Sequence, residues 1–169
     1  VINKAFDDVV NENDYLFSMQ EAGKVLQTYF QKMQQKKFEK NKGAGEQFLA
    51  ENKNKEGIKT TPSGIQYKIL KEGTGKSPTP ESKVTCHYHG TLIDGTVFDS
   101  SVERDEPAQF PVKGVIKGWQ EILPMMKEGG KWKIFVPQEL AYGANPRPGG
   151  VIEPYMTLIF EIELVSVDS

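Results

Sequence analysis

VKGVIKGW, residues 112–119, is the stretch that decides the fold of this chain. Ile122, Leu123 and Met126 follow its tryptophan at intervals of three, four and seven residues, the spacing of the apolar face of a helix. The stretch therefore predicts a short helix with Trp119 on its first turn. A tryptophan in this position either fills a hydrophobic core or forms the floor of an apolar cavity, and the function depends on which of these is true.

The segments around this helix alternate apolar and polar residues, which is the pattern of half-buried strands. They are residues 65–69, 83–92, 97–99, 131–136 and 158–164. Asp94-Gly95 between the second and third segments predicts a tight hairpin. Such strands form antiparallel sheets with one apolar and one solvated face, and the helix at Trp119 is the only available cover for the apolar face. The predicted fold class is α+β, an antiparallel twisted sheet wrapped on one short helix.

The front of the chain differs in composition, because its first sixty residues contain no proline and all ten prolines lie from Pro62 onward. Apolar residues at helical spacing predict a helix over residues 2–10, and Ser18 with Glu21 predicts a capping box at the start of a long helix that ends near residue 52. The polar middle of this helix favours a solvated connector over a coiled coil.

This difference divides the chain into two domains. Residues 1–60 form an all-α arm with a long connecting helix, and residues 61–169 form the α+β domain. Because about 30 residues cannot bury a core of their own, we expect the arm to dimerise with a second chain or to dock on the α+β domain.

Composition excludes several classes of function. The net charge of −2, with 26% charged residues, gives no electrostatic basis for binding nucleic acid or a membrane surface. No run approaches the ~20 apolar residues of a membrane span. A single cysteine, Cys86, excludes an intramolecular disulfide and a multi-cysteine metal site, and we expect this thiol to be buried.

Two weaker signals point to other chemistry. His87 and His89 share the outward face of a strand, but no third metal ligand lies at a suitable spacing, so a solvated strand face is favoured over a metal site and no cofactor is expected. A hydrolase triad of Ser100, His87 and Asp99 is possible on paper, yet the elbow motif of such enzymes is missing.

Five short motifs stand in order along the back half of the chain. They are His87–Gly90, Phe98–Ser101, Val115–Trp119, Ala141–Ala144 and Thr157–Phe160. In order and spacing they resemble the FK506-binding proteins (FKBPs), a family of peptidyl-prolyl cis–trans isomerases, over about residues 61–167. The front, with GEQFLAENK at 45–53, resembles the macrophage infectivity potentiator (Mip) branch of that family.

The Mip branch typically forms homodimers through N-terminal helices, so the resemblance implies a homodimer. The front is shorter here than in that branch, and we expect part of the dimerisation module to be missing. The resemblance also implies a periplasmic or outer-membrane-associated protein, although the single cysteine is equally compatible with the cytoplasm.

The activity implied by the resemblance is rotation about Xaa-Pro peptide bonds in folding proteins, together with chaperone activity. Amide resonance sets a barrier of about 18–20 kcal/mol, and no bond is broken, so no nucleophile is required. An apolar, dry cavity binds the twisted transition state better than the planar amide. The implied partners are proline-containing polypeptides and macrolide inhibitors such as tacrolimus and rapamycin.

The resemblance also assigns roles to individual residues. Trp119 is the pocket floor, Tyr88, Phe98 and Phe160 are aromatic walls, and Val115, Ile116 and Ile152 are aliphatic contacts. The polar groups are the Ile116 backbone N–H, the Tyr142 hydroxyl and the Asp99 carboxylate, which pairs with Arg104 and Tyr88. Asp99, Tyr142, Tyr88 and Trp119 are the predicted catalytic residues, and the others bind the substrate.

Two departures from the family pattern leave a second function open. Ala108 stands where many FKBPs have a pocket phenylalanine, which predicts an opened wall. The loop at residues 145–154 is unusually rich in proline and glycine, and only Ile152 is carried over from it. Both departures favour the alternative of a prolyl-peptide-binding chaperone module with little or no turnover.

Overall fold

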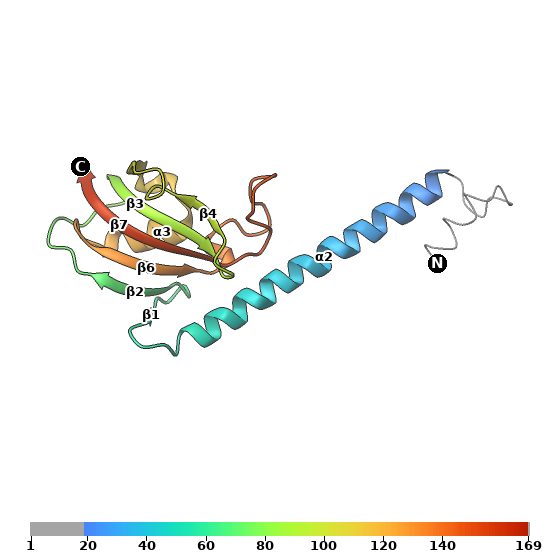
Figure 1. Cartoon of the computed structure of the whole chain (residues 1–169), viewed down its shortest axis with the longest axis horizontal. Coiled ribbons are helices and arrows are strands. Elements are labelled where there is room, and N and C mark those ends of the chain that lie inside the picture. Colours follow the sequence, from blue (N-terminus) through green and yellow to red (C-terminus); the bar gives the residue numbers. More distant parts are fainter. Residues whose placement is uncertain (1–18, 169) are drawn as a thin grey trace. The chain divides into compact units, whose positions relative to one another are not determined.

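The computed structural model describes residues 19–168, which comprise a long helix, a seven-stranded sheet and a short helix (Figure 1). The helices are α2 (Met19–Asn52) and α3 (Lys117–Ile122), with short 3-10 helices η1 (Val112–Gly114), η2 (Leu123–Met125) and η3 (Gln138–Leu140). The strands are β1 (Lys59–Thr60), β2 (Gln66–Lys71), β3 (Lys83–Leu92), β4 (Val97–Ser100), β5 (Ala108–Pro111), β6 (Lys131–Val136) and β7 (Leu158–Asp168). The helix predicted over residues 2–10 and the cap predicted at Ser18 lie outside the described residues.

The sheet is antiparallel throughout, in the order β1-β2-β6-β7-β3-β4, with β5 paired to β3. Its centre is the long β3–β7 pair, which runs from Lys83 opposite Asp168 to Leu92 opposite Leu158. In β3 the buried and half-buried residues alternate from Val84 to Leu92, as the period-two pattern predicted.

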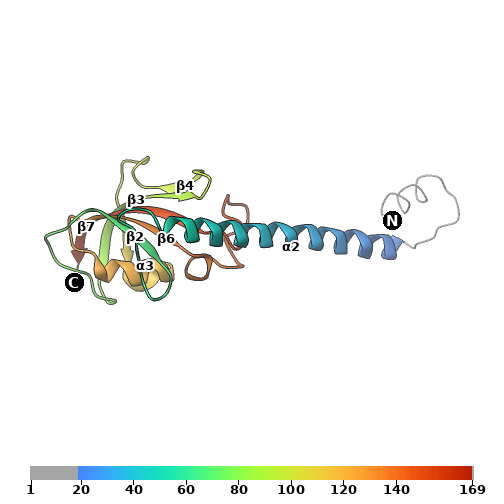
Figure 2. The same cartoon turned by 90° about the horizontal axis from the view of Figure 1, so that it is seen from below.

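The short helix covers one face of this sheet (Figure 2). Trp119 is 4% exposed, and Ile122, Leu123 and Met126 are fully buried in the same core as the inward residues of β3, β6 and β7. The predicted helical stripe is therefore real, although η2 takes over from α3 at Leu123. The predicted α+β fold, with a long helix before the sheet, is confirmed.

The other face of the sheet is not fully solvated, contrary to the sequence prediction. The end of α2 packs against it, with the rings of Phe48 and Phe135 5.9 Å apart. Buried Asn52 donates a hydrogen bond to Gln66 Oε1 at 2.8 Å, and Gln66 Nε2 donates to the Leu49 carbonyl at 2.7 Å. Because Phe135 points away from the core side of β6, the alternation within that strand could not reveal its cover.

Contacts within the chain divide it between Glu39 and Lys40 into two compact units. In the first unit, the described part of α2 exposes large apolar side chains. They are Met19, Leu26, Tyr29, Phe30 and Met33. The second unit contains the last turns of α2 and the whole sheet, so the connecting helix that we predicted to be solvated is solvated only in part.

Gly45 and Gly43 on α2 allow a matched test of this packing. A Cβ on Gly45 would overlap Oγ1 of Thr157, a buried residue just before β7, whereas a Cβ on Gly43 meets nothing within 4 Å. We expect Gly45→Ala to lower the free energy of unfolding by about 1–3 kcal/mol. Gly43→Ala should raise it by up to about 1 kcal/mol through helix propensity. Urea denaturation followed by circular dichroism measures both, and stabilisation by both substitutions would contradict the packing of α2 against Thr157.

Candidate functional site

A small pocket of about 120 Å³ opens beside α3. It is lined by Tyr88, Phe98, Asp99, Phe110, Val115, Ile116, Trp119, Tyr142 and Phe160. Eight of these nine residues belong to the site predicted from the sequence, and they come from β3, β4, β7, the start of α3 and the segment after η3. The structure therefore brings together residues that are up to 72 positions apart, from Tyr88 to Phe160.

Trp119 forms the centre of an aromatic cluster in this pocket. The rings of Tyr88, Phe110 and Phe160 stand nearly perpendicular to it, with centroids 5.6, 5.7 and 5.3 Å away. Phe98 meets Phe160 edge to face at 5.4 Å. Aromatic pairs favour this geometry over face-to-face stacking. The cluster therefore holds its rings rigidly and surrounds an apolar cavity without collapsing into it.

A closed hydrogen-bonded network forms the polar edge of the pocket. The Tyr88 hydroxyl donates to Asp99 Oδ2 at 2.6 Å, Arg104 Nη1 donates to Asp99 Oδ1 at 2.6 Å, and Arg104 Nη2 donates to the Tyr88 hydroxyl at 3.0 Å. The Arg104 guanidinium also lies 5.9 Å from the centre of the Tyr88 ring. Arg104 itself does not line the pocket; it holds the two residues that do.

This network shifts the pKa values of its members in opposite directions. Burial raises the pKa of Tyr88, and the hydrogen bond to Asp99 raises it further. For Asp99, burial acts to raise the pKa, but hydrogen bonds from Tyr88 and Arg104 outweigh it and leave the pKa below its ordinary value. The phenol therefore stays protonated and the carboxyl stays ionised at neutral pH.

These directions give a testable pH dependence. Because the folded pKa of Asp99 lies below its ordinary value of 3.8, its contribution to stability is present above that pH and is lost as the pH falls through the folded pKa. Carbon-13 NMR of the aspartate carboxyls should show Asp99 titrating below pH 3.8. Arg104→Gln should move that midpoint upward, and an unchanged midpoint would show that Arg104 does not hold the carboxylate.

The sequence motifs indicated this arrangement. It is an aromatic pocket with a hydrogen-bonded polar edge, on a sheet wrapped around one helix. Residues 74–165 match the domain family described as FKBP-type peptidyl-prolyl cis-trans isomerase. Residues 1–69 match the domain that lies amino-terminal to it. The chain belongs to the FKBP-type peptidyl-prolyl cis–trans isomerase family.

Individual relatives place this FKBP near the Mip and FkpA proteins. It is 57% identical to the peptidyl-prolyl cis-trans isomerase Mip of Coxiella burnetii over 120 residues, 71% of this chain and 52% of that protein. It is 54% identical to the outer membrane protein MIP of Legionella longbeachae over 133 residues, 78% of this chain and 56% of that protein. The chain thus spans little more than half the length of these two relatives.

Solved structures agree with the sequence comparison. The crystal structure of FkpA from Escherichia coli superposes with a TM-score of 0.80 at 35% identity, covering 99% of this chain and 80% of that one. A peptidyl-prolyl cis-trans isomerase from Pseudomonas syringae superposes with a TM-score of 0.72 at 37% identity, covering 78% and 96%. The resemblance to the Mip branch, including its front domain, is confirmed.

Two further groups face the FKBP pocket from loops. Tyr142, 41% exposed, lies just after η3 and lines the pocket mouth. Ile116 is the N-cap residue of α3, and its carbonyl accepts hydrogen bonds from the N–H groups of Trp119 and Gln120 at 3.0 and 3.1 Å. The Gln120 side chain also donates to the Val115 carbonyl at 2.7 Å, which fixes the rim segment to the helix.

A wider groove of about 620 Å³ continues from the pocket mouth. Phe98, Asp99, Phe110, Ile116 and Tyr142 belong to both, and Gly114, Arg147, Gly150, Val151 and Ile152 line the groove alone. Ile152, which the sequence analysis placed at the site, therefore borders the groove and not the inner pocket. Arg147 and Val151 were not foreseen, because only Ile152 was carried over from this loop rich in proline and glycine.

Ala108 contributes nothing to the lining of either cavity, and its predicted opening of the pocket wall stays a prediction. It packs on the core, opposite Cys86 on β3. Phe110, two residues further on the same face of β5, forms the wall through contacts with Tyr88 and Trp119 at 5.8 and 5.7 Å. Its alternation with Ala108 was the signal that could have identified it.

The histidines and the serine that suggested a metal site or a hydrolase triad make structural contacts instead. His87 Nδ1 lies 3.3 Å from Ser101 Oγ, and His89 Nδ1 lies 2.9 Å from Ser100 Oγ. Ser100 and His87 thus contact other groups, and Asp99 is held in the network above, so the hydrolase triad is not assembled. Within residues 19–168, no three acidic, histidine or cysteine side chains are grouped to hold a metal ion. Burial raises the pKa of Cys86 to about 12, so this thiol is inert.

Proposed function

We propose that this chain catalyses cis–trans isomerisation of Xaa-Pro bonds in folding polypeptides. The observation that supports this most directly is the rigid aromatic pocket of about 120 Å³, whose size suits a single small apolar ring. Its floor is Trp119, and its mouth carries an ordered carboxylate and a hydroxyl. Proline is the residue whose side chain is such a ring, and its peptide bond would lie at that mouth.

The chemistry follows from what rotation does to the amide. At the twisted transition state the bond loses resonance, its carbonyl becomes less polar, and its nitrogen gains lone-pair character. An apolar wall therefore stabilises the twisted bond more than the planar one, and this difference lowers the barrier. Uncatalysed exchange takes tens to hundreds of seconds, so even a modest reduction of the barrier is useful to a folding chain.

Directed hydrogen bonds would hold the substrate on either side of the rotating bond. The Ile116 N–H and the Tyr142 hydroxyl would donate to substrate carbonyls, while the ring of the proline rests on Trp119. The Asp99 carboxylate, fixed by Tyr88 and Arg104, would lie beside the bond as it turns. The Asp99 carboxylate and the Trp119 ring are already oriented by the protein, so little ordering of these two groups is needed on binding.

A protease-coupled assay with a prolyl tetrapeptide tests this function. We expect wild type to accelerate isomerisation well above background, and Tyr142→Phe and Asp99→Leu each to lower kcat/KM by about tenfold, the value of one hydrogen bond. Gln109→Ala is the matched control, because this exposed side chain bonds to Asp168 away from the pocket. If wild type and all variants stay at background while a prolyl peptide still binds, the chaperone module without turnover is the correct function.

We also propose that the chain works as a homodimeric chaperone through its helical arm. The match of residues 1–69 to the amino-terminal FKBP domain supports this. So does the exposed apolar surface of α2, where Leu26, Phe30 and Met33 lie three to four residues apart on one face. Sedimentation velocity at several concentrations should show dimers in wild type and monomers in Leu26→Asp/Phe30→Asp. A wild type that stays monomeric at every concentration contradicts the dimer.

The similarity to the Mip proteins also supports proposals about inhibitors and about the cellular compartment. We propose that tacrolimus and rapamycin occupy the pocket and inhibit the isomerase, and that the protein acts in the periplasm or at the outer membrane. The outer membrane protein MIP of Legionella longbeachae supports this location. Among the described helices, none is both long enough and apolar enough to cross a bilayer. Inhibitor titration and subcellular fractionation of the native cells test these two proposals.

A further inference from the structure

The last loop of the domain, residues 141–157, connects η3 to β7 and reaches into the wider groove. Arg147, Val151 and Ile152 on this loop line the groove. The two ends of the loop are joined by a hydrogen bond from the Tyr155 N–H to the Gly143 carbonyl at 2.8 Å. Between these ends the loop is rich in glycine and proline, so its own sequence does little to fix where the tip lies.

The Asn41 side chain of α2 contacts this loop just beyond its tip. Asn41 Nδ2 donates to Glu153 Oε2 at 3.0 Å and to the Pro154 carbonyl at 3.2 Å. An amide carries two N–H donors, and both are used here on residues that directly follow Ile152. The two contacts join segments 112 and 113 residues apart in the sequence.

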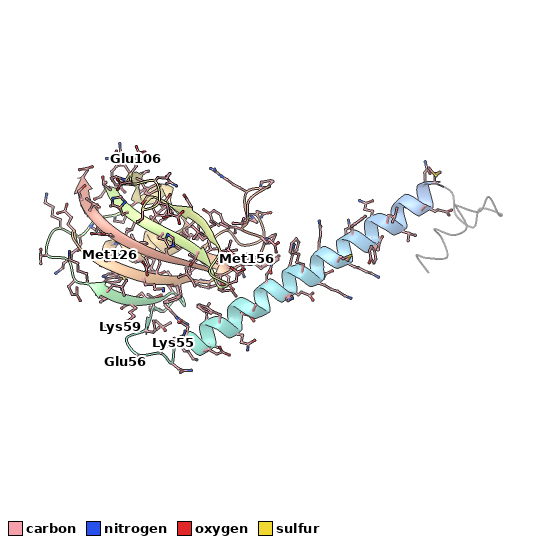
Figure 3. The ribbon with its side chains drawn as sticks, in the orientation of Figure 1. Lys55, Glu56, Lys59, Glu106, Met126 and Met156 are labelled. Atoms are coloured by element: carbon pink, nitrogen blue, oxygen red, sulfur yellow. The ribbon has the colours of Figure 1, made fainter. Side chains whose placement is uncertain are left out.

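The same part of α2 also lies against the last residues of the loop. Gly45 packs against Thr157, and Asn41 and Ala44 border a cavity of about 400 Å³ together with Met156, which is labelled in Figure 3. The part of α2 from Lys40 onward and the loop belong to one compact unit. The helix thus contacts the loop from Glu153 to Thr157.

We propose that Asn41 is a positioning residue for the substrate groove, holding Val151 and Ile152 where a polypeptide beyond the prolyl ring would contact them. Fixing a loop in advance removes an ordering cost that the substrate would otherwise have to offset. The end of the connecting helix is therefore a working part of the isomerase site. This proposal rests on the proposed function, because it assumes that a prolyl polypeptide occupies the groove.

The geometry predicts a specific signature for this role. The inner pocket contains no residue of the segment 145–157, whereas the groove contains four of them. Loss of the Asn41 contacts should therefore leave a ligand that fills only the inner pocket unaffected. It should weaken a peptide that extends past the proline into the groove. A purely structural role for Asn41 would affect both ligands alike or neither.

Asn41→Ala in the whole chain tests this, with Gln47→Ala as control. Gln47 is likewise an amide on α2, but it is exposed and bonds to Glu51 on its own helix. For a prolyl octapeptide we expect Asn41→Ala to raise KM about fivefold with kcat within twofold, and N-acetylproline amide should bind as in wild type. Hydrogen exchange at residues 150–152 should become faster. Adding Glu153→Ala to Asn41→Ala should produce less than the sum of the single effects.

The outcomes separate this proposal from the proposed function. Unchanged exchange at 150–152 in Asn41→Ala, or equal changes in Gln47→Ala, overturns the positioning role. An equal loss of affinity for the short and the long ligand also overturns it. If wild type shows no turnover, the isomerase function fails, and the octapeptide dissociation constant and the exchange rates still decide the role of Asn41.

Discussion

Replacing Trp119 with leucine is expected to remove most of the isomerase activity, lowering kcat/KM about 100-fold or more. The indole is the floor of the pocket and the common partner of three perpendicular rings, at centroid distances of 5.3–5.7 Å. Its loss leaves a cavity at the floor of the pocket and frees Tyr88, Phe110 and Phe160 to move into it. The free energy of unfolding should fall by about 2–4 kcal/mol as well, because a large buried side chain is shortened.

The second tryptophan of the chain separates these two effects. Trp132 is as buried as Trp119, at 5% against 4%, but stacks on Tyr67 at 4.8 Å and lines neither the pocket nor the groove. Trp132→Leu should therefore cost similar stability and leave kcat/KM within a few-fold of wild type. Urea denaturation and the protease-coupled assay, run where both variants are folded, measure this. Equal loss of activity in both would show that the pocket floor has no special role.

The parts of the fold that the sequence predicted well are those whose signal is local. The alternation in β3 runs from Val84 to Leu92, and in β7 from Leu158 to Leu164, so each strand reports its own buried face. The apolar residues that follow Trp119 at helical spacing likewise identify the buried face of α3 and η2. In these segments the side chains that are buried follow directly from the period of the backbone.

The parts that were missed depend on partners far along the chain. β5 has only four residues and ends at Pro111, too short for its alternation to stand out, so Phe110 was overlooked. Asn52 and Gly45 looked like features of a solvated helix. Their burial is decided by Gln66 and Thr157, which lie 14 and 112 positions away. No pattern within α2 carries that information.

The polar network shows the same limit at the site. Asp99 and Arg104 are five residues apart, which is consistent with many loop geometries, and Tyr88 lies on a different strand. Only the resemblance to the FKBP family suggested that the three would meet. The sequence supplied the residue types, and the pairing of β3 with β4 supplied the distances.

Adding one methyl group at Gly90 is expected to push the Phe98 ring into the pocket and so reduce its volume. A Cβ at this position on β3 would lie 2.5 Å from Phe98 Cζ, 2.7 Å from Phe98 Cε2 and 3.2 Å from Phe160 Cε1. The strand cannot retreat, because it is hydrogen-bonded to both β4 and β7. The Phe98 ring must therefore move, and the space open to it is the pocket of about 120 Å³ that it lines.

Gly90→Ala should accordingly lower kcat/KM and the affinity for tacrolimus by at least about tenfold, with a loss of about 1–3 kcal/mol in unfolding free energy from overpacking. The double variant Gly90→Ala/Phe98→Leu removes the ring that the methyl group strikes. It should bind tacrolimus more tightly than Gly90→Ala, although less tightly than wild type, because a wall of the pocket is gone. Calorimetric titration of the inhibitor gives these affinities. If the double variant binds no more tightly than Gly90→Ala, the clash with Phe98 is not the cause of the weaker binding, and the methyl group acts on some other part of the pocket.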